Sequence, residues 1–508
     1  MSVKLRTYPT EELTGSTESE KISSSTKKLL KKHKLFISLN VFCILLISAM
    51  LGMNSKAEIA TGVYVILLFL ICTLPLIHIK SYRSKEVLML MFLAYYFGTF
   101  GLNDISVLIS FEPMTRIFPG IFLSEGELVI LAGAIFFMLG YAIASSFFSE
   151  NSKGILRKDW HPKTILILGL VFWVVGFYIT LSWQLGVADR YSGTEINTNI
   201  AGFIALFRQL QPLGTLLLVY LYLTSKNKTI LIVVIFTMAA DFVLGFIGDS
   251  KEIAIRGPLL FIFSYLILRD RVPVVGTVVF AIIAGISFNL FAAYRLAIHT
   301  SHTSRSDAAQ NIGKQLDSIG GDKQSLSDRL SDGLEYFSQR ITLKQNVELI
   351  VSRTGKDIDY QDGYTLAPVL YAFIPRFILP NKQDSGEAGR LFNREFKISG
   401  DKDTYISVGH LGELYWNYGW TGALIGMAFI GAILAMVSSL LRLDTNPTLP
   451  RYLLLLMTIY TLILRFEGAF AMTYTVWMRL SVLLLLMNAL VPKIKQTHSN
   501  SSKSLTSN

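Results

Sequence analysis

The sequence is poor in cysteine and in charged residues. Of its 508 residues only Cys43 and Cys72 are cysteines, and both lie inside apolar runs, so neither a disulfide framework nor a cysteine metal site is available. Charged residues make up 16% of the chain, whereas an ordinary soluble domain has roughly 25%. Hydrophobic residues make up 52%, so the apolar excess must be buried somewhere other than a globular core.

Several short catalytic signatures are also missing. The sequence contains no GxxxxGK[ST] phosphate loop, no HExxH motif and no CxxC motif. No motif in it therefore indicates nucleotide hydrolysis or a metal protease. We therefore expect no metal and no cofactor.

Long apolar runs recur along most of the chain. Each has roughly 20 residues, which is enough for a helix to cross the hydrocarbon layer of a membrane. The pattern predicts an all-α fold, a polytopic transmembrane helix bundle with about 12 spans and one large, partly helical extracytoplasmic loop. The expected spans are 35–53, 61–79, 86–103, 128–148, 164–185, 203–224, 229–248, 253–268, 273–294, 411–441, 452–470 and 472–491.

The basic residues indicate orientation. The net charge is +11, but Lys and Arg gather in alternate connections between the apolar runs, so we interpret them as topology signals rather than as a nucleic-acid surface. Both termini are expected in the cytoplasm. The predicted organisation is a disordered basic N-terminus at 1–34, helices one to nine within 35–294, the extracytoplasmic loop at 295–410, helices ten to twelve within 411–491 and a cytoplasmic tail at 492–508.

The loop at 295–410 changes character along its length. Its first part is polar, whereas 334–353 places apolar residues near helical spacing and predicts an amphipathic helix. The apolar segment 363–382 is interrupted by three prolines, so it is too broken to span and is expected to be a re-entrant or interfacial element.

Arginines are frequent on the predicted outer side. A guanidinium beside hydrocarbon is costly unless it faces a polar cavity or an anion, and its planar fork matches a phosphate. These residues are therefore candidate contacts for a diphosphate-bearing substrate: Arg208, Arg256, Arg295, Arg340, Arg376, Arg465 and Arg479. The alternative is that each one reaches the lipid headgroups or pairs with a nearby acid, Arg465 with Glu467 and Arg256 with Asp249 or Glu252.

The segment 405–431 combines glycines, aromatic residues and two ionisable groups. Tyr415 and Trp416 offer flat faces suited to sugar rings, although an aromatic belt at a helix entrance is an equally ordinary reading. His410 and Glu413 are three residues apart and share a helical face, so they are candidates for a proton acceptor and its orienting partner.

Two motifs resemble the bacterial O-antigen polymerase family. The first is a glycine, an apolar stretch, IPR and then P-x-K, and the second is GExYxNxGxxGxxxG. The residues that carry them are Gly363, Ile374, Pro375, Arg376, Pro380, Lys382, Gly412, Glu413, Tyr415, Asn417, Gly419, Gly422 and Gly426. Arg340 and Arg376 match positions where such enzymes keep arginines, whereas His410 departs from the pattern.

The resemblance implies a metal-independent glycosyltransferase at the outer face of the bacterial inner membrane. It would polymerise undecaprenyl-diphosphate-linked oligosaccharide repeat units into a surface polysaccharide, with Asn417 beside Tyr415 and Trp416 as substrate-binding candidates. The expected partners are the lipid-linked oligosaccharide, membrane lipid and a chain-length regulator protein. The alternatives are a ligase that transfers finished glycan to another acceptor and a flippase for the lipid-linked unit.

Overall fold

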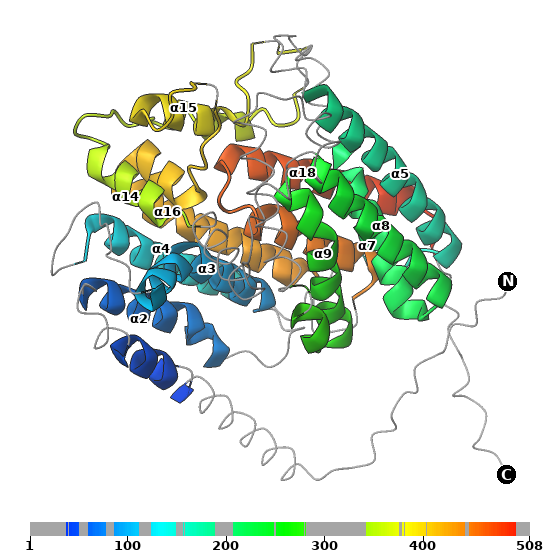
Figure 1. Ribbon diagram of the computed structural model, residues 1–508. Helices are drawn as coiled ribbons and strands as arrows, with labels where there is room; N and C mark the ends of the chain where they lie inside the picture. The colour runs from blue at the N-terminus through cyan, green and yellow to red at the C-terminus, as the bar shows by residue number, and fades with distance from the viewer. Residues whose placement is uncertain are drawn as a thin grey trace, which may run out of the picture.

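The computed structural model in Figure 1 shows a bundle of helices. It describes residues 37–38, 40–49, 59–77, 86–110, 123–148, 156, 158–187, 207–247, 250–278, 280, 342–374, 378–379, 381–402, 404–441 and 447–493. Over these ranges the chain forms helices and turns and no strand, so the predicted all-α class is confirmed.

Seven helices in the described ranges are long and apolar enough to cross a membrane. They are α2 (Ile59–Thr73) with its continuation η1 (Leu74–Ile77), α3 (Val87–Ser110), α4 (Glu125–Phe147), α5 (Pro162–Val187), α8 (Lys228–Ile247), α16 (His410–Leu441) and α18 (Phe470–Leu490).

Shorter or more polar helices occupy other expected spans. They are Asn40–Ala49, α7 (Leu210–Ser225), α9 (Lys251–Arg269) and α17 (Leu449–Thr458) with its π-helical continuation η4 (Ile459–Ile463). Most of the expected span 273–294 lies outside the described residues. The count of about 12 spans therefore stays a prediction.

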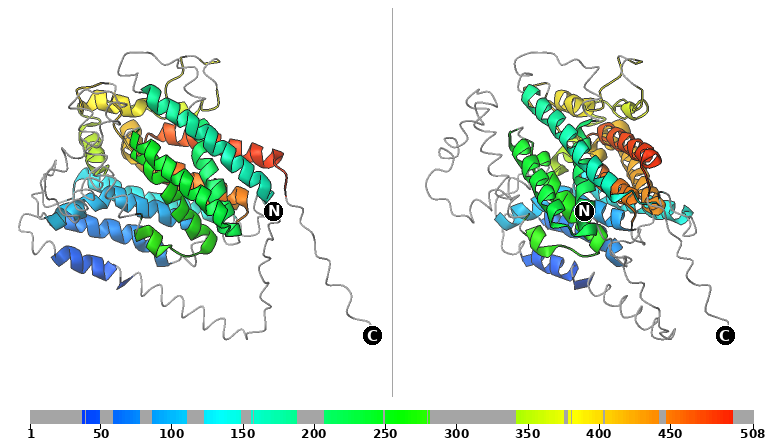
Figure 2. Two further views of the ribbon diagram at one scale, coloured as in Figure 1. Left: turned by 45° about the vertical axis from the view of Figure 1, so that its right-hand side comes forward. Right: turned by 90° about the vertical axis from the view of Figure 1, so that its right-hand side faces the viewer.

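The bundle has two groups of helices. α2, α3, α4 and α16 pack together, as do α5, α7, α8 and α9, and Figures 1 and 2 show the groups side by side. α17 contacts α7 and α9 in one group and α16 in the other, and η4 contacts α3. The stretch from α17 to η4 therefore joins the two groups.

Glycines bring paired helices into backbone contact. A Cβ atom on Gly140 of α4 would lie 1.9 Å from the carbonyl oxygen of Ala428, and one on Gly431 of α16 would lie 2.1 Å from that of Phe137. α5 and α7 meet in the same way at Gly176, where an added Cβ would lie 2.3 Å from a backbone nitrogen. Small residues of this kind allow membrane helices to associate through close van der Waals contact.

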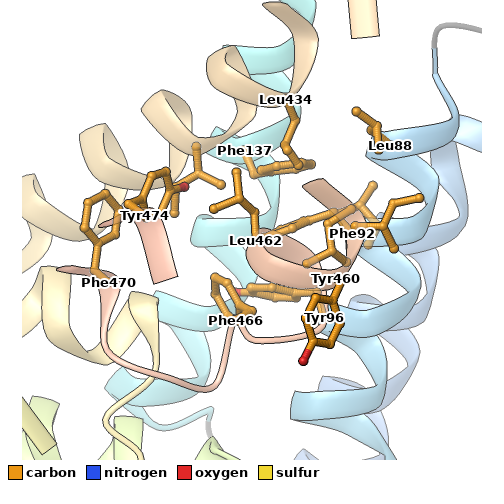
Figure 3. Close-up of a cluster of buried hydrophobic side chains, with 14 of the residues drawn as sticks. Leu88, Phe92, Tyr96, Phe137, Leu434, Tyr460, Leu462, Phe466, Phe470 and Tyr474 are labelled. Carbon is orange, nitrogen blue, oxygen red and sulfur yellow. The ribbon is translucent and has the colours of Figure 1, made fainter. Parts of the chain in front are cut away.

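Aromatic rings fill the centre of the first group. Phe92 of α3 stacks on Phe137 of α4 with ring centroids 3.9 Å apart, and Phe466, which follows η4, lies 5.2 Å from Phe92 and 5.7 Å from Tyr96 (Figure 3). These rings are buried. Such packing holds the chain immediately after η4 in place.

The outer surfaces of several helices are apolar. On α5, Val174 is 55% exposed, and on α8, Ile232 and Phe236 are 67% and 62% exposed. A soluble protein rarely exposes contiguous apolar faces of this kind, whereas lipid solvates them at little cost. The exposed side chains thus agree with a membrane environment.

The described part of the 295–410 loop contains α14 (Lys344–Arg353), η3 (Ala367–Val369) and α15 (Glu387–Phe396). α14 confirms the second part of the amphipathic helix predicted at 334–353, and residues 334–341 lie outside the described ranges. The described part of 363–382 forms turns around η3, which packs against α18. α15 was not predicted.

A break divides α16. Tyr418 has φ −142° and ψ 23°, and Gly419 has φ 59° and ψ −145°, so the helix stops after Asn417 and resumes beyond the glycine. The positive φ of Gly419 is a conformation that residues with a Cβ rarely adopt. The break separates the motif residues 410–417 from the longer apolar helix that follows.

Candidate functional site

The N-terminal ends of several helices meet on one face of the bundle. Glu252 in the first turn of α9 contacts the segment that leads into α18, and Glu413 in the first turn of α16 binds the start of α18 at Phe470. Tyr415 of α16 binds Glu125 in the first turn of α4. We call this region the N-terminal face. Helix N-termini carry partial positive charge and favour anions.

The starts of α16 and α18 hold each other in place. The backbone nitrogens of Gly409 and His410 donate to the carbonyls of Glu467 and Phe466, at 3.0 and 3.1 Å. In return, Glu413 Oε2 accepts a 2.7 Å hydrogen bond from the backbone nitrogen of Phe470, the first residue of α18. Backbone donors that a helix end would leave without partners are thereby satisfied.

His410 and Glu413 are both fully buried and both face α18. His410 Nε2 lies 2.8 Å from Thr473 Oγ1, and its Nδ1 has no hydrogen-bond partner among the described residues. Glu413 Oε1 likewise has no hydrogen-bond partner there. The expected shared face is present, but each side chain is held by α18.

The two motif segments meet in space. Asn417 Oδ1 accepts a 2.8 Å hydrogen bond from the backbone nitrogen of Gly363, and its Nδ2 donates to Thr365 Oγ1 at 2.8 Å and to the carbonyl of Glu413 at 2.7 Å. Asn417 is fully buried, so it acts as a connector between the segments rather than as an exposed contact. This connection joins 363–382 to the first part of α16.

The aromatic residues of α16 have different surroundings. Trp416 is fully buried and packs against Phe396 and Phe392, so its ring is not presented to a ligand. Tyr415 and Trp420 both donate to Glu125 Oε1, at 3.2 and 3.0 Å. Glu125 is exposed, so this contact reaches the surface of the N-terminal face.

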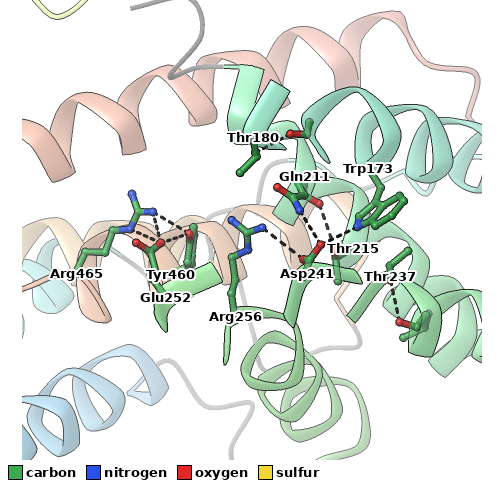
Figure 4. A network of polar contacts seen from close by, with 12 residues as sticks. Trp173, Thr180, Gln211, Thr215, Thr237, Asp241, Glu252, Arg256, Tyr460 and Arg465 are labelled. Atoms are coloured by element: carbon green, nitrogen blue, oxygen red, sulfur yellow. Dashed lines mark hydrogen bonds and ion pairs between the residues drawn. The ribbon is translucent and has the colours of Figure 1, made fainter. Parts of the chain in front are cut away.

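A buried polar network crosses the second group of helices (Figure 4). Asp241 of α8 accepts hydrogen bonds from Trp173 of α5 at 3.1 Å and from Gln211 of α7 at 2.6 Å. Arg256 of α9 forms an ion pair with the same carboxylate at 3.4 Å. Arg256 therefore pairs with Asp241 rather than with Glu252, and Asp249 lies outside the described residues.

A second cluster joins α9 to the chain after η4. Arg465 Nε donates to Glu252 at 3.1 Å, its Nη2 donates to Tyr460 at 2.8 Å, and Tyr460 also donates to Glu252. The partner of Arg465 is thus Glu252 rather than Glu467. Arg208, whose guanidinium lies 5.6 Å from the Trp183 ring, is within electrostatic range of this cluster.

Burial affects two charged groups at this cluster. It lowers the pKa of the Arg208 guanidinium, and the charges of Arg256 and Arg465 act in the same direction against the opposing effect of Glu252. Burial also raises the pKa of Glu467 to about 7, with Glu252 adding to the rise and Arg465 opposing it.

The remaining predicted arginines are distributed as follows. Arg479 of α18 donates from Nε to the carbonyl of Ala372 at 2.9 Å, so it attaches the segment around η3 to α18. Arg295, Arg340 and Arg376 lie outside the described residues. Their proposed roles stay predictions.

Sequence reasoning missed a buried ionic cluster around α14. Lys344 Nζ donates to Asp104 at 2.6 Å and to Glu127 at 2.8 Å, and it lies 4.3 Å from the centre of the Tyr64 ring. Burial raises the pKa of the nearby Glu348, which accepts a hydrogen bond from a serine. A lysine within an otherwise amphipathic helix was the only sequence signal.

The described residues contain no group of three or more His, Cys, Asp or Glu side chains placed to hold a metal ion. Comparison of the chain with protein-family models, with curated proteins and with solved structures gives no match.

Proposed function

We propose that the protein is a membrane glycosyltransferase that polymerises undecaprenyl-diphosphate-linked oligosaccharide repeat units at the outer face of the bacterial inner membrane. The observation that carries the proposal is the meeting of the two motif segments. Asn417 joins 363–382 to the start of α16, and residues 464–470 connect that start to Arg465. This grouping of a buried carboxylate, the motif segments and an arginine in one region supports the proposal.

The reaction requires little covalent work from the protein. A hydroxyl oxygen of one lipid-linked unit forms a bond to the anomeric carbon of a second, the bond from that carbon to the diphosphate oxygen breaks, and undecaprenyl diphosphate leaves. The proton of the hydroxyl passes to a base. Catalysis then depends on positioning and on stabilising the charge of the departing diphosphate.

The arginine clusters suit the diphosphate. Arg208, Arg256 and Arg465 lie near the carboxylates of Asp241, Glu252 and Glu467. Arg256 and Arg465 form ion pairs with Asp241 and Glu252, whereas Arg208 forms no ion pair with a described residue. We assign Arg208 to diphosphate binding.

Glu413 is the proposed base. Its Oε2 accepts from Phe470, and the Thr365 hydroxyl lies beside the carboxylate, whose Oε1 forms no hydrogen bond within 3.5 Å among the described residues. A buried carboxylate oxygen without a partner is uncommon in proteins. The hydroxyl of the acceptor sugar would supply that partner. Because Glu413 is fully buried, the segment at Thr365 would have to move aside before the hydroxyl could reach it.

The test uses lipid-linked single repeat units, extracted from a host strain that lacks this protein, and the purified protein in lipid. We expect a ladder of longer saccharides and released undecaprenyl diphosphate, both unchanged by a metal chelator. Transport of the lipid-linked units across vesicles without chain growth would refute polymerisation in favour of a flippase. Transfer of finished glycan to a different acceptor would refute it in favour of a ligase.

Arg208→Gln tests the proposed contact between Arg208 and the diphosphate. Loss of a charge-assisted contact made in the transition state should lower turnover about 10-fold to 100-fold, with little change in the amount of folded protein. Arg271→Gln, at an exposed arginine outside the N-terminal face, is the control. Equal turnover in the two variants would remove Arg208 from the site.

A further inference from the structure

An open cavity of about 590 Å³ lies within the described part of 364–387 and shares no residue with the arginine clusters. Its volume falls in the range of about 300–1,000 Å³ that is usual for small-molecule sites. One side comes from the turns around η3 and the other from the chain that leads into α15. The cavity therefore belongs to the motif segment.

The walls combine ring faces with amide groups. Tyr364 and Tyr371 line one side, and Asn381 and Gln383 line the other. Tyr371 OH lies 3.4 Å from Gln383 Oε1, whereas Gln383 Nε2 is buried and has no hydrogen-bond partner among the described residues. Leaving a buried donor unsatisfied is unfavourable, so an acceptor on a ligand would be favoured there.

The charged groups of the wall are already engaged. Lys382 donates to the carbonyl of Ile374, and Asp384 and Glu387 each bind Arg390 at 2.8 Å. The wall carries one ammonium, that of Lys382, and two carboxylates, those of Asp384 and Glu387, so its charge does not favour an anionic ligand.

We propose that this cavity binds the neutral saccharide part of the lipid-linked substrate. The substrate class rests on the proposed function, whereas the cavity does not. The tyrosine faces would pack against the C–H faces of a sugar ring, and the amides and carboxylates would exchange hydrogen bonds with its hydroxyl groups. The saccharide and the diphosphate are thereby assigned to different groups of residues.

Arg479 ties the cavity to the proposed base. Its guanidinium binds the carbonyl of Ala372, one residue after Tyr371 of the cavity wall. Arg479 belongs to α18, whose first residue, Phe470, holds Glu413. A saccharide in the cavity is therefore positioned by the same helix that positions Glu413.

The experiment measures binding to the full-length protein in detergent by calorimetry. The probe is a set of oligosaccharides released by partial acid hydrolysis from the surface polysaccharide of the host. We expect Tyr371→Ala and Gln383→Ala to weaken binding at least 10-fold, and Tyr371→Phe, which keeps the ring, to weaken it less. Tyr178→Ala, which removes a 68% exposed tyrosine from α5, should bind as the wild type does.

Three results would overturn the assignment. The first is saccharide affinity that stays at the wild-type value in both Tyr371→Ala and Gln383→Ala. The second is a wild type that binds no saccharide, and the third is competition between inorganic pyrophosphate and the saccharide for the cavity. A wild type that binds saccharide through these residues but forms no polymer would support the cavity and refute the proposed function, so the two failures are distinguishable.

Discussion

Replacing Glu413 by glutamine separates catalysis from structure at the start of α16. Glu413 Oε2 accepts a 2.7 Å hydrogen bond from the backbone nitrogen of Phe470. The amide oxygen of glutamine can keep this bond, but the negative charge at the N-terminus of α18 is lost. That loss should lower the free energy of unfolding by about 1 kcal/mol or less.

The expected catalytic loss is larger. If Glu413 accepts the proton of the acceptor hydroxyl, Glu413→Gln should lower turnover about 100-fold or more. A 100-fold loss corresponds to about 2.7 kcal/mol of transition-state stabilisation. The catalytic effect therefore exceeds the structural one by a margin that an assay can resolve.

The assay counts polymer formed per folded molecule, with lipid-linked repeat units and protein quantified after size exclusion. Glu413→Ala should also lose the bond to Phe470 and about 1–3 kcal/mol of stability, which identifies the structural effect separately. Glu395→Gln, at an exposed glutamate of α15, is the control. Wild-type turnover per folded molecule in Glu413→Gln would refute the base assignment, and His410→Gln would be assayed next.

Three further predictions concern packing, charge and pH. Gly140→Ala should destabilise the protein by about 1–3 kcal/mol or more because its Cβ would meet the Ala428 carbonyl oxygen, whereas the control Gly400→Ala has no atom within 4 Å of its Cβ and should not. Thermal unfolding in detergent compares the two variants, and equal unfolding midpoints would contradict the contact. Lys344→Met should lower the free energy of unfolding by about 3–5 kcal/mol because it leaves Asp104 and Glu127 buried without their cation, and Lys356→Met at an exposed lysine is the control. Equal protease resistance of the 342–374 segment in the two variants would count against the cluster. The pKa of Glu467 is raised from 4.5 to about 7, so between these pH values the folded chain keeps a proton that the unfolded chain has lost, and the free energy of unfolding should fall as the pH rises. Glu467→Gln should flatten this part of a pH series of unfolding midpoints, and an unchanged slope would exclude Glu467 as its source.

The sequence was informative about the helices because their signal is local. Apolar runs near 20 residues indicated α4, α5, α8 and α18 within a few residues of their observed bounds. The amphipathic spacing before 353 also indicated α14. Each of these patterns depends only on neighbouring residues and on the thickness of the hydrocarbon layer.

The partners of charged residues were predicted less well. Arg256 was expected to contact the substrate or, as the alternative, to pair with Asp249 or Glu252, yet its partner Asp241 lies 15 residues away on another helix. Lys344 binds Asp104 across 240 residues of sequence. Such pairs depend on which helices pack together, and periodicity carries no information about that.

The aromatic residues of α16 illustrate the same limit. Trp416 and Trp420 lie on one short stretch, yet the first is buried against α15 and the second binds exposed Glu125. The sequence grouped Trp416 with the sugar-facing residues because it gave no sign of α15. Only the folded chain distinguishes a ring that supports the site from a ring at its surface.

The short stretch 464–470 connects the starts of three helices, α9, α16 and α18. At one end Arg465 holds Glu252, and at the other end Phe470 holds Glu413, while the carbonyls of Phe466 and Glu467 bind the start of α16. These seven residues therefore carry contacts to the first turns of α9 and α16 and run directly into α18. A substitution that breaks the Arg465–Glu252 contact is thus expected to change the position of Phe470 and, with it, that of Glu413.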